Sequence, residues 1–467
     1  MKRLQVKVRG YKVKRGEITA FLSLIFVLLI SFIAALLEST VIQVSKNQKR
    51  LDADRAVFSI FGEYSRDLLE EYEILAIDGS YGTGSYEEKN LTDRMHYYGT
   101  GGMEHDIQGI QYLTDRNGSA FKEQALEFME QAYGIAAVRE LAGRTGLWEE
   151  QEIQGEEADR QDSKINTELE EILADSENPL PDEENPLPHI AELKTSGILQ
   201  LVLPQDYQIS DRQIAPGEQA SGRNLRSGRG SFYIRQGMDG IEERLLFHEY
   251  LIKKFGSAVS GKGENRNLSY ELEYMLSGRS SDCENLEAVV KKLLGMRLGI
   301  NYLYLQTDSA KQAEAEALAL SLSTLAALPA VSGIVKQALL AAWAFGESMM
   351  DLRSLLSGKK AALIKNSTNW QLSLSSLMTL GTGEDIQEGA DADGGLTYTD
   401  YLRILLFLKD EDTLVMKALD RVEQNMRSEK GNTSFCIDSC TVRLRVQNRA
   451  VIREGLNYQF PLYFGYE

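Results

Sequence analysis

The longest hydrophobic run in the chain lies close to its first residue. Residues 18–37, ITAFLSLIFVLLISFIAALL, contain no charged side chain. A helix of this length extends about 30 Å, which matches the hydrocarbon core of a bilayer. The pattern therefore predicts a transmembrane helix over residues 18–37, with the lipid bilayer as the partner of this segment.

Apolar side chains recur at three- and four-residue steps beyond this run, as far as Leu69. Such spacing places them on one face of an α-helix. We therefore expect one long helix that leaves the membrane and continues toward Glu71. Gly62 is its expected weak point, because glycine lowers helix stability.

Alternating apolar and polar residues predict several strands. The first is expected at Glu73–Asp78 and the second at Glu104–Leu113, followed by a helix over Ser119–Leu141. Residues 431–467 alternate again and are rich in β-branched and aromatic side chains, which predicts two further strands. We expect these late strands to pair with the early ones.

The pattern changes between residues 149 and 239. Six of the eight prolines of the chain lie in residues 149–216, acidic residues crowd together, and ENPLPDEENPLP repeats a short unit. Such composition buries little apolar surface, and proline favours extended backbone. We expect a flexible insertion with one strand at Ile198–Leu203. The repeated unit is either a solvated spacer or a docking motif.

Residues 240–430 show about five apolar stripes of helical period with short connections, which predicts a helical bundle. The fold class is therefore α+β, mainly α, with a small antiparallel sheet of early and C-terminal strands. The expected order is a basic cytoplasmic tail, a transmembrane helix, a stalk helix with a first αβ part, a flexible insertion, a helical bundle and a β segment: residues 1–17, 18–37, 38–148, 149–239, 240–430 and 431–467.

Seven basic residues precede the apolar run. Positive charge stays on the cytoplasmic side, so we expect a cytoplasmic N-terminus and an extracellular remainder. A cleaved leader is the alternative, but its apolar region is shorter and ends in small residues, whereas Leu36, Leu37 and Glu38 stand here. We expect a retained single-pass anchor in the cell membrane.

The net charge of −18 lies on the part of the chain after the anchor. Acidic surfaces repel nucleic acid, so we expect no nucleic-acid partner. The expected cytoplasmic tail is too short for a folded module.

Motifs for catalysis and for metal binding are absent. The chain has no P-loop, no G-x-S-x-G elbow and no G-x-G-x-x-G after a strand. Its four histidines lack metal-ligand spacing, and HEYL at His248 lacks the second histidine of a zinc protease, so we expect Glu249 to face outward. We expect no enzyme, no cofactor and no metal.

A calcium loop is conceivable in DADGGLTYTDYL, with Asp391 and Asp393 at its first and third positions. Leu396 and Leu402 then occupy the positions that need glycine and a bidentate glutamate. We interpret the segment as a turn followed by a capping box of Thr397 and Asp400.

The three cysteines are too few for a disulfide framework. Cys436 and Cys440 lie too far apart on a strand to form a bridge, unless CIDSC bends into a turn. We expect buried thiols there. Cys283 lies near a helix start, where a lowered thiol pKa is possible, but a structural role is the simpler interpretation.

Glu347 and Asp351 share one side of a predicted helix with Trp343. Two carboxylates can perform acid–base catalysis. The alternative, which we favour, is that they form ion pairs with lysines that follow, at Lys359, Lys360 or Lys365.

Four segments carry a family resemblance: RGEITAFLSLIFVLLISFIAALLES, LSYELEYMLSGRSSDCENLEAVVKKLLGMRLGINYLYL, AAWAFGESMMDLRSLLSGKKAALIKNSTNW and LTYTDYLRILLFL. Together they resemble an uncharacterised domain-of-unknown-function family of single-span proteins from Gram-positive bacteria. The resemblance implies association with tight-adherence (Flp-type, Tad) pilus loci and an N-terminus similar to TadE and TadG proteins. A prepilin cut after Gly16 would place Phe21 where glutamate is required, so a retained membrane subunit is expected.

Two functional hypotheses follow. The first is a non-enzymatic, membrane-anchored exterior protein with protein partners in a pilus-like or secretion apparatus. The second is an anchored extracellular hydrolase or cell-wall-acting enzyme that uses Glu347 and Asp351. The oligomeric state is left open.

Overall fold

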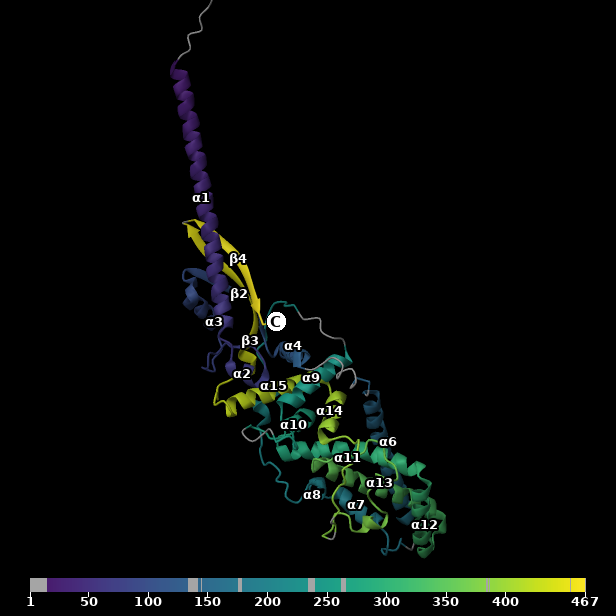
Figure 1. The fold of residues 1–467 in the computed structure, drawn as a ribbon. Helices are drawn as coiled ribbons and strands as arrows, with labels where there is room; N and C mark the ends of the chain where they lie inside the picture. The colour runs from purple at the N-terminus through teal and green to yellow at the C-terminus, as the bar shows by residue number, and fades with distance from the viewer. Residues whose placement is uncertain are drawn as a thin grey trace, which may run out of the picture. The chain divides into compact units, whose positions relative to one another are not determined.

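The structure is a computed structural model that describes residues 15–132, 142–143, 145–174, 179–233, 240–261, 266–383, 385, 387–453 and 455–466. The chain forms two compact units (Figure 1). The first takes in the described parts of Met1–Glu63, Glu87–Ile110 and Arg443–Gly465. The second takes in those of Tyr64–Tyr86, Gln111–Val442 and Tyr466–Glu467. Each unit therefore combines segments that are far apart in sequence.

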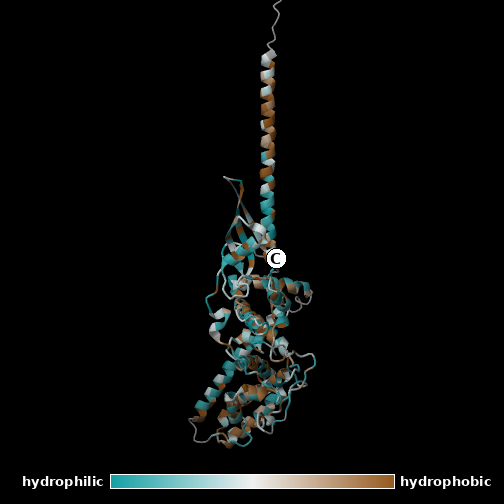
Figure 2. Ribbon diagram, turned by 90° about the vertical axis from the view of Figure 1, so that its left-hand side faces the viewer, coloured by the Kyte–Doolittle hydropathy of each residue, from teal (hydrophilic) through white to brown (hydrophobic). Residues whose placement is uncertain are grey.

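Helix α1 (Arg15–Phe61) begins the first unit as one uninterrupted helix. Its early part is apolar and exposed, which is compatible with a single-pass membrane anchor, and Figure 2 shows the change to polar residues further along. The backbone N–H of Glu63 donates to the carbonyl of Ile60, so the last turn tightens and the helix ends at Phe61, just before Gly62. The expected long helix is confirmed and breaks at Gly62, its expected weak point, but it does not continue toward Glu71, because Arg66–Tyr72 form a separate helix, α2.

The rest of the first unit packs on one face of α1. Helix α3 (Glu88–Met95), the π-helical turn η1 (His96–Thr100) and strand β4 (Leu456–Gly465) all contact α1. Ala53, Ala56 and Ile60 are fully buried on this face. The ring centroids of Phe61 and Phe464 lie 4.6 Å apart. The last turns of α1 therefore pack against strand β4.

The sheet has four strands, and β3 (Cys440–Arg453) is the central one. Strands β1 (Ile77–Asp78) and β2 (Met103–Tyr112) lie on its two sides, and β4 pairs antiparallel with its later residues. The predicted pairing of late with early strands is confirmed. The first strand is shorter than predicted, because Glu73 caps a helix with left-handed backbone and Leu75 hydrogen-bonds the side chain of Gln124.

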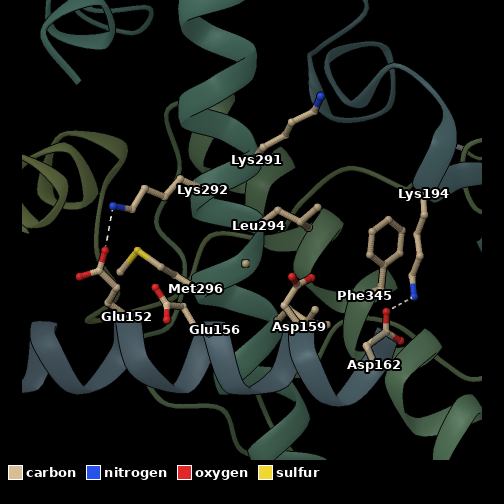
Figure 3. Close-up of a pocket in the computed structure, with 13 residues that line it drawn as sticks. Glu152, Glu156, Asp159, Asp162, Lys194, Lys291, Lys292, Leu294, Met296 and Phe345 are labelled. Carbon is tan, nitrogen blue, oxygen red and sulfur yellow. Dashed lines mark hydrogen bonds and ion pairs between the residues drawn. The ribbon is translucent and has the colours of Figure 1, made fainter. Parts of the chain in front are cut away.

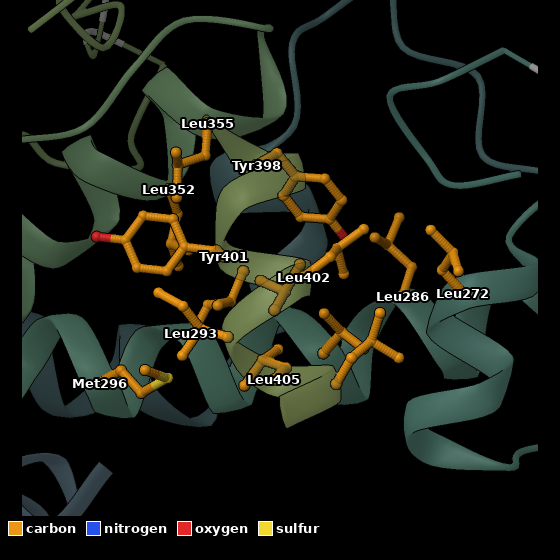
Figure 4. Close-up of a cluster of buried hydrophobic side chains, with 14 of the residues drawn as sticks. Leu272, Leu286, Leu293, Met296, Leu352, Leu355, Tyr398, Tyr401, Leu402 and Leu405 are labelled. Atoms are coloured by element: carbon orange, nitrogen blue, oxygen red, sulfur yellow. The ribbon is translucent and has the colours of Figure 1, made fainter. Parts of the chain in front are cut away.

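The second unit is helical apart from β1 and parts of β2 and β3. Its helices are α2 (Arg66–Tyr72), α4 (Asp115–Ala132), α6 (Thr145–Ala174), α7 (Leu187–Thr195), α8 (Ile198–Val202), α9 (Ile241–Lys254), α10 (Glu271–Ser277), α11 (Asp282–Thr307), α12 (Ser309–Leu325), α13 (Ser332–Leu356), α14 (Tyr398–Leu408) and α15 (Glu411–Ser428). Figure 4 shows leucines and tyrosines from α10, α11, α13 and α14 in one core. The expected bundle is therefore present. Residues 133–141 of the helix expected at Ser119–Leu141 lie outside the described residues.

The expected flexible insertion is helical over much of its length. Helix α6 is 30 residues long and buries Trp148, Ala158 and Leu169, chiefly against α11. The strand expected at Ile198–Leu203 is helix α8, which buries Ile198, Leu199 and Val202. A few well-spaced apolar residues, together with close helix packing, offset the acidic composition that suggested an extended chain.

Candidate functional site

A cleft of about 450 Å³ opens in the second unit, and residues of α6, α7, α11 and α13 line it (Figure 3). One wall is the acidic side of α6, and the other carries three lysines. Leucine, methionine and phenylalanine side chains supply the apolar part of the lining. The charged residues of the cleft are Glu152, Glu156, Asp159, Asp162, Lys194, Lys291 and Lys292.

Ion pairs connect the two walls. Lys292 of α11 lies 2.8 Å from Glu152, and Lys194 of α7 lies 2.5 Å from Asp162. Figure 3 shows both pairs at opposite ends of the cleft, with Glu156 and Asp159 between them. Charges of both signs therefore face the same space. This lining suits a charged protein segment better than a ligand of a single charge sign.

Glycines bring α6 and α11 into direct backbone contact beneath the cleft. A Cβ atom added to Gly299 would come within 2.6 Å of the backbone nitrogen of Gly155 and 2.7 Å of the carbonyl of Gln154. A Cβ atom added to Gly155 would meet the carbonyl of Gly295 at 2.9 Å. Only residues without a side chain allow this approach, so the glycines set the position of the acidic wall.

We expect Gly299→Ala to destabilise the second unit by about 1–3 kcal/mol, because the added methyl group overpacks the contact between the helices. Gly295→Ala is the matched control, since a Cβ atom there has nothing within 4 Å and alanine favours helix. Urea unfolding of both variants measures the difference. Equal stability of the two variants would contradict the close contact.

The two carboxylates singled out by the sequence, Glu347 and Asp351, lie in the core on α13 and have no exposed side-chain area. The Nζ atom of Lys365 lies 2.5 Å from Glu347 and 2.7 Å from Asp351. The expected ion pairing is therefore confirmed, with Lys365 as the partner of both. Lys359 instead pairs with the exposed Glu388 at 3.3 Å.

A second cation that the sequence analysis missed completes this network. Arg297 of α11 donates to Asp351 through Nε at 2.9 Å and Nη2 at 2.7 Å, and to the hydroxyl of Tyr401 at 2.9 Å. Backbone N–H groups of Gln371 and Leu372 donate to Glu347. Two buried cations thus balance two buried carboxylates. In the sequence, the signal for this second cation was an arginine among the apolar core positions of α11.

The pKa values of the two carboxyl groups are shifted in opposite directions. Burial raises the pKa of Glu347, although the charge of Lys365 opposes this effect. Burial also acts to raise the pKa of Asp351, but the charges of Arg297 and Lys365 outweigh it and hold that pKa below its usual value. Neither residue belongs to the lining of the cleft. The geometry is that of a structural network, because every charge in it is paired.

The HEYL segment at His248 lies on α9 in the second unit. His248 and Glu249 are both buried on α9, so the expectation that Glu249 faces outward is wrong. Arg403 of α14 pairs with Glu249 there, which accounts for a carboxylate inside the unit.

In the first unit, the ring centroids of His96 and His105 lie 4.9 Å apart. His105 also hydrogen-bonds Thr100 and Asn448, so partners within the unit occupy both of its ring nitrogens.

All three cysteines are free. Residues Ile437–Ser439 form a 3₁₀ turn, so CIDSC does bend. Cys440 is buried as expected, and that burial raises the pKa of its thiol, whereas Cys436 is only half-buried, so the expectation of a buried thiol there is wrong. Cys283 is exposed, and partial burial together with Glu287 and Glu284 raises its pKa. A raised pKa does not favour a nucleophilic thiolate.

One cluster in the described residues has the ligand types of a metal site: Glu423, Cys436 and Asp438, with candidate ligand atoms within 4.8 Å of one another. Arg223 binds both carboxylates, at 2.6 Å and 2.8 Å, and Arg427 lies 3.1 Å from Glu423. Because two guanidinium groups already neutralise these acids, the cluster is better described as an ion-pair network.

The capping box of Thr397 and Asp400 at the start of α14 is present as predicted.

Comparison with known families identifies most of the second unit. A family of unknown function, DUF5702, matches residues 176–452. The chain belongs to the DUF5702 family. No curated protein and no solved structure matches the chain. The DUF5702 match includes the buried network around Asp351, three of the four helices that line the cleft and nearly all of strand β3, whereas α1 and α6 precede it.

Proposed function

We propose that this DUF5702 protein is a non-enzymatic, membrane-anchored exterior protein that acts through protein contacts, as an accessory or structural component of a pilus-like or secretion apparatus at the cell surface. The observation that carries the proposal is α1, an apolar helix of membrane length that continues without a break into the first unit. The seven basic residues before it support a cytoplasmic N-terminus, because positive charge is retained on the inner side of a membrane. The choice of a pilus-like apparatus rests on the sequence resemblance to proteins of tight-adherence pilus loci.

The cleft supports a role in binding rather than in reaction chemistry. Its walls carry paired charges of both signs, while the carboxylates best placed by sequence for acid–base work are ion-paired in the core. A charged segment of a partner protein can exchange with the Lys292–Glu152 pair at little cost, because both side chains are partly exposed and surface pairs contribute only about 0–1 kcal/mol.

The exposed thiol of Cys283 provides a test of the exterior placement. A membrane-impermeant maleimide added to intact cells at mildly alkaline pH should label the full-length protein, and Cys283→Ser should abolish most of the label. The alkaline pH compensates for the raised thiol pKa. Labelling that appears only after lysis would place the second unit inside the cell and contradict the proposal.

A photo-crosslinking residue at Lys291 tests the proposed partner class, because this side chain lines the cleft and is 61% exposed. Leu325 is the matched control on α12, at 71% exposure and outside the cleft. We expect Lys291, but not Leu325, to capture pilus-assembly or secretion proteins, identified by mass spectrometry. Equal capture at both positions, or capture of envelope enzymes alone, would contradict it.

A further inference from the structure

The part of α1 that follows the membrane-length stretch has two apolar faces. One face is buried in the first unit and carries Ala53, Ala56, Val57 and Ile60. The opposite face carries Val41, Val44, Leu51 and Phe58, each between 61% and 66% exposed, and of these Phe58 also meets the ring of Phe464 of β4 edge-on, with ring centroids 5.8 Å apart. An isolated exposed leucine is ordinary, but four large apolar residues in a row on one helix need an explanation. We name Val41, Val44, Gln48, Leu51, Arg55 and Phe58 the outer stripe.

The outer stripe has the spacing of a coiled-coil seam. Its residues follow one another at steps of three, four, three, four and three, and the apolar Val44, Leu51 and Phe58 recur every seven residues. Continued backward, the same seven-residue spacing reaches Leu37 and Ile30 in the apolar part of α1. A seven-residue apolar repeat packs against another helix with the same repeat. The buried face, in contrast, belongs to the positions that point away from such a seam.

Three arguments identify the occupant as a second copy of the chain. A membrane inserts every copy with the same orientation and depth, so identical residues meet in register. The stripe is self-complementary in a parallel pair, because each apolar position faces its own counterpart. Charge also matches: Arg55, which lies 3.4 Å from Asp52 of its own helix, comes beside Asp54 of the other copy, and Asp54 is exposed without an ion pair among the described residues.

We propose that two copies of this protein pair in parallel along the outer stripe of α1, with the first unit of each copy on the side away from the seam. The inference rests on the membrane anchoring of the proposed function but not on any partner apparatus. Gln48 and Arg55 occupy one of the two seam positions in successive repeats. Polar residues at that position fix register and a two-stranded state at some cost in stability.

Disulfide trapping in native membranes tests the pairing. Leu51→Cys and Val44→Cys are made in the full chain with Cys283→Ser, which removes the exposed native thiol. Arg50→Cys and Gln43→Cys are the matched controls, because these exposed neighbours on α1 lie outside the stripe. After oxidation, nonreducing gels should show a product of twice the chain mass on the order of tenfold more abundant for the stripe variants, because a disulfide needs Cβ atoms about 3.5–4.5 Å apart.

The outcomes separate the two proposals. Equal yields from stripe and control positions would indicate random collision and overturn the pairing, as would an adduct whose mass differs from twice that of the chain. Absence of the protein from the membrane fraction would instead contradict the anchoring itself. Leu51→Asp, at the same exposed position, should abolish co-purification of two differently tagged copies, whereas Arg50→Asp should leave it unchanged.

Discussion

Replacement of Lys365 by methionine should destabilise the second unit by about 3–5 kcal/mol, because it removes the cation shared by two fully buried carboxylates. Methionine retains most of the volume of the side chain, so the loss reports the charge rather than a cavity. The measurement is the free energy of unfolding in urea, with circular dichroism at 222 nm as the signal.

Lys359→Met is the control for this experiment. That lysine lies six residues away and pairs with a glutamate that is 88% exposed, so its loss should cost less than about 1 kcal/mol. The double variant Lys365→Met with Glu347→Gln should recover part of the loss, because it removes the carboxylate that would otherwise remain uncompensated. If Lys365→Met were as stable as Lys359→Met, the network would not stabilise this unit.

Replacement of His248 by leucine should stabilise the protein, and the gain should grow toward acid pH. The imidazole is buried, and neither ring nitrogen has a hydrogen-bond partner among the described residues. Burial, with the nearby charges of Arg244 and Lys122, lowers the pKa of His248 to about 3. The folded state therefore keeps this group neutral under conditions in which the unfolded chain binds a proton.

The sign of the pH effect follows from that difference. Below the unfolded pKa of about 6.5, protonation favours the unfolded state, so His248 costs stability at a rate of up to about 1.4 kcal/mol per pH unit down to about pH 3. Unfolding free energies at pH 7 and pH 5 should thus differ less in His248→Leu than in the natural chain. His189→Leu is the control, since it loses a hydrogen bond to the carbonyl of Leu380 and should only destabilise. An unchanged pH slope in His248→Leu would contradict the buried neutral state.

Sequence patterns determine the parts of this fold in which one physical signal dominates. The apolar run and the three- and four-residue steps that follow it predicted a long helix with Gly62 as its weak point, and alternation predicted β2, β3 and β4. The capping box at Thr397 follows from neighbouring residues, and Glu347 and Asp351 share one face of α13, although their partner Lys365 lies beyond the end of that helix. The signals themselves come from residues that are neighbours along the chain or on one element.

Helix α6 could not be predicted, because the decisive interaction is not local. Its sequence is dominated by exposed acidic residues, and its burial depends on glycines of α11 more than a hundred residues later that admit close backbone contact. The inward position of Glu249 depends in the same way on Arg403. The cleft arises from the contact between α6 and α11, so its acidic wall was visible in the sequence but its lysine wall and its depth were not.

The buried face of α1 is covered in part by β4, which follows it far along the chain. Until β4 has been synthesised, Ala53, Ala56 and Ile60 therefore lack part of their cover. Chains that terminate before β4 would leave these apolar side chains open to solvent, and incompletely folded proteins are removed by chaperones and proteases. The architecture thereby couples the lifetime of the protein to translation through β4, and products that lack this strand should be short-lived.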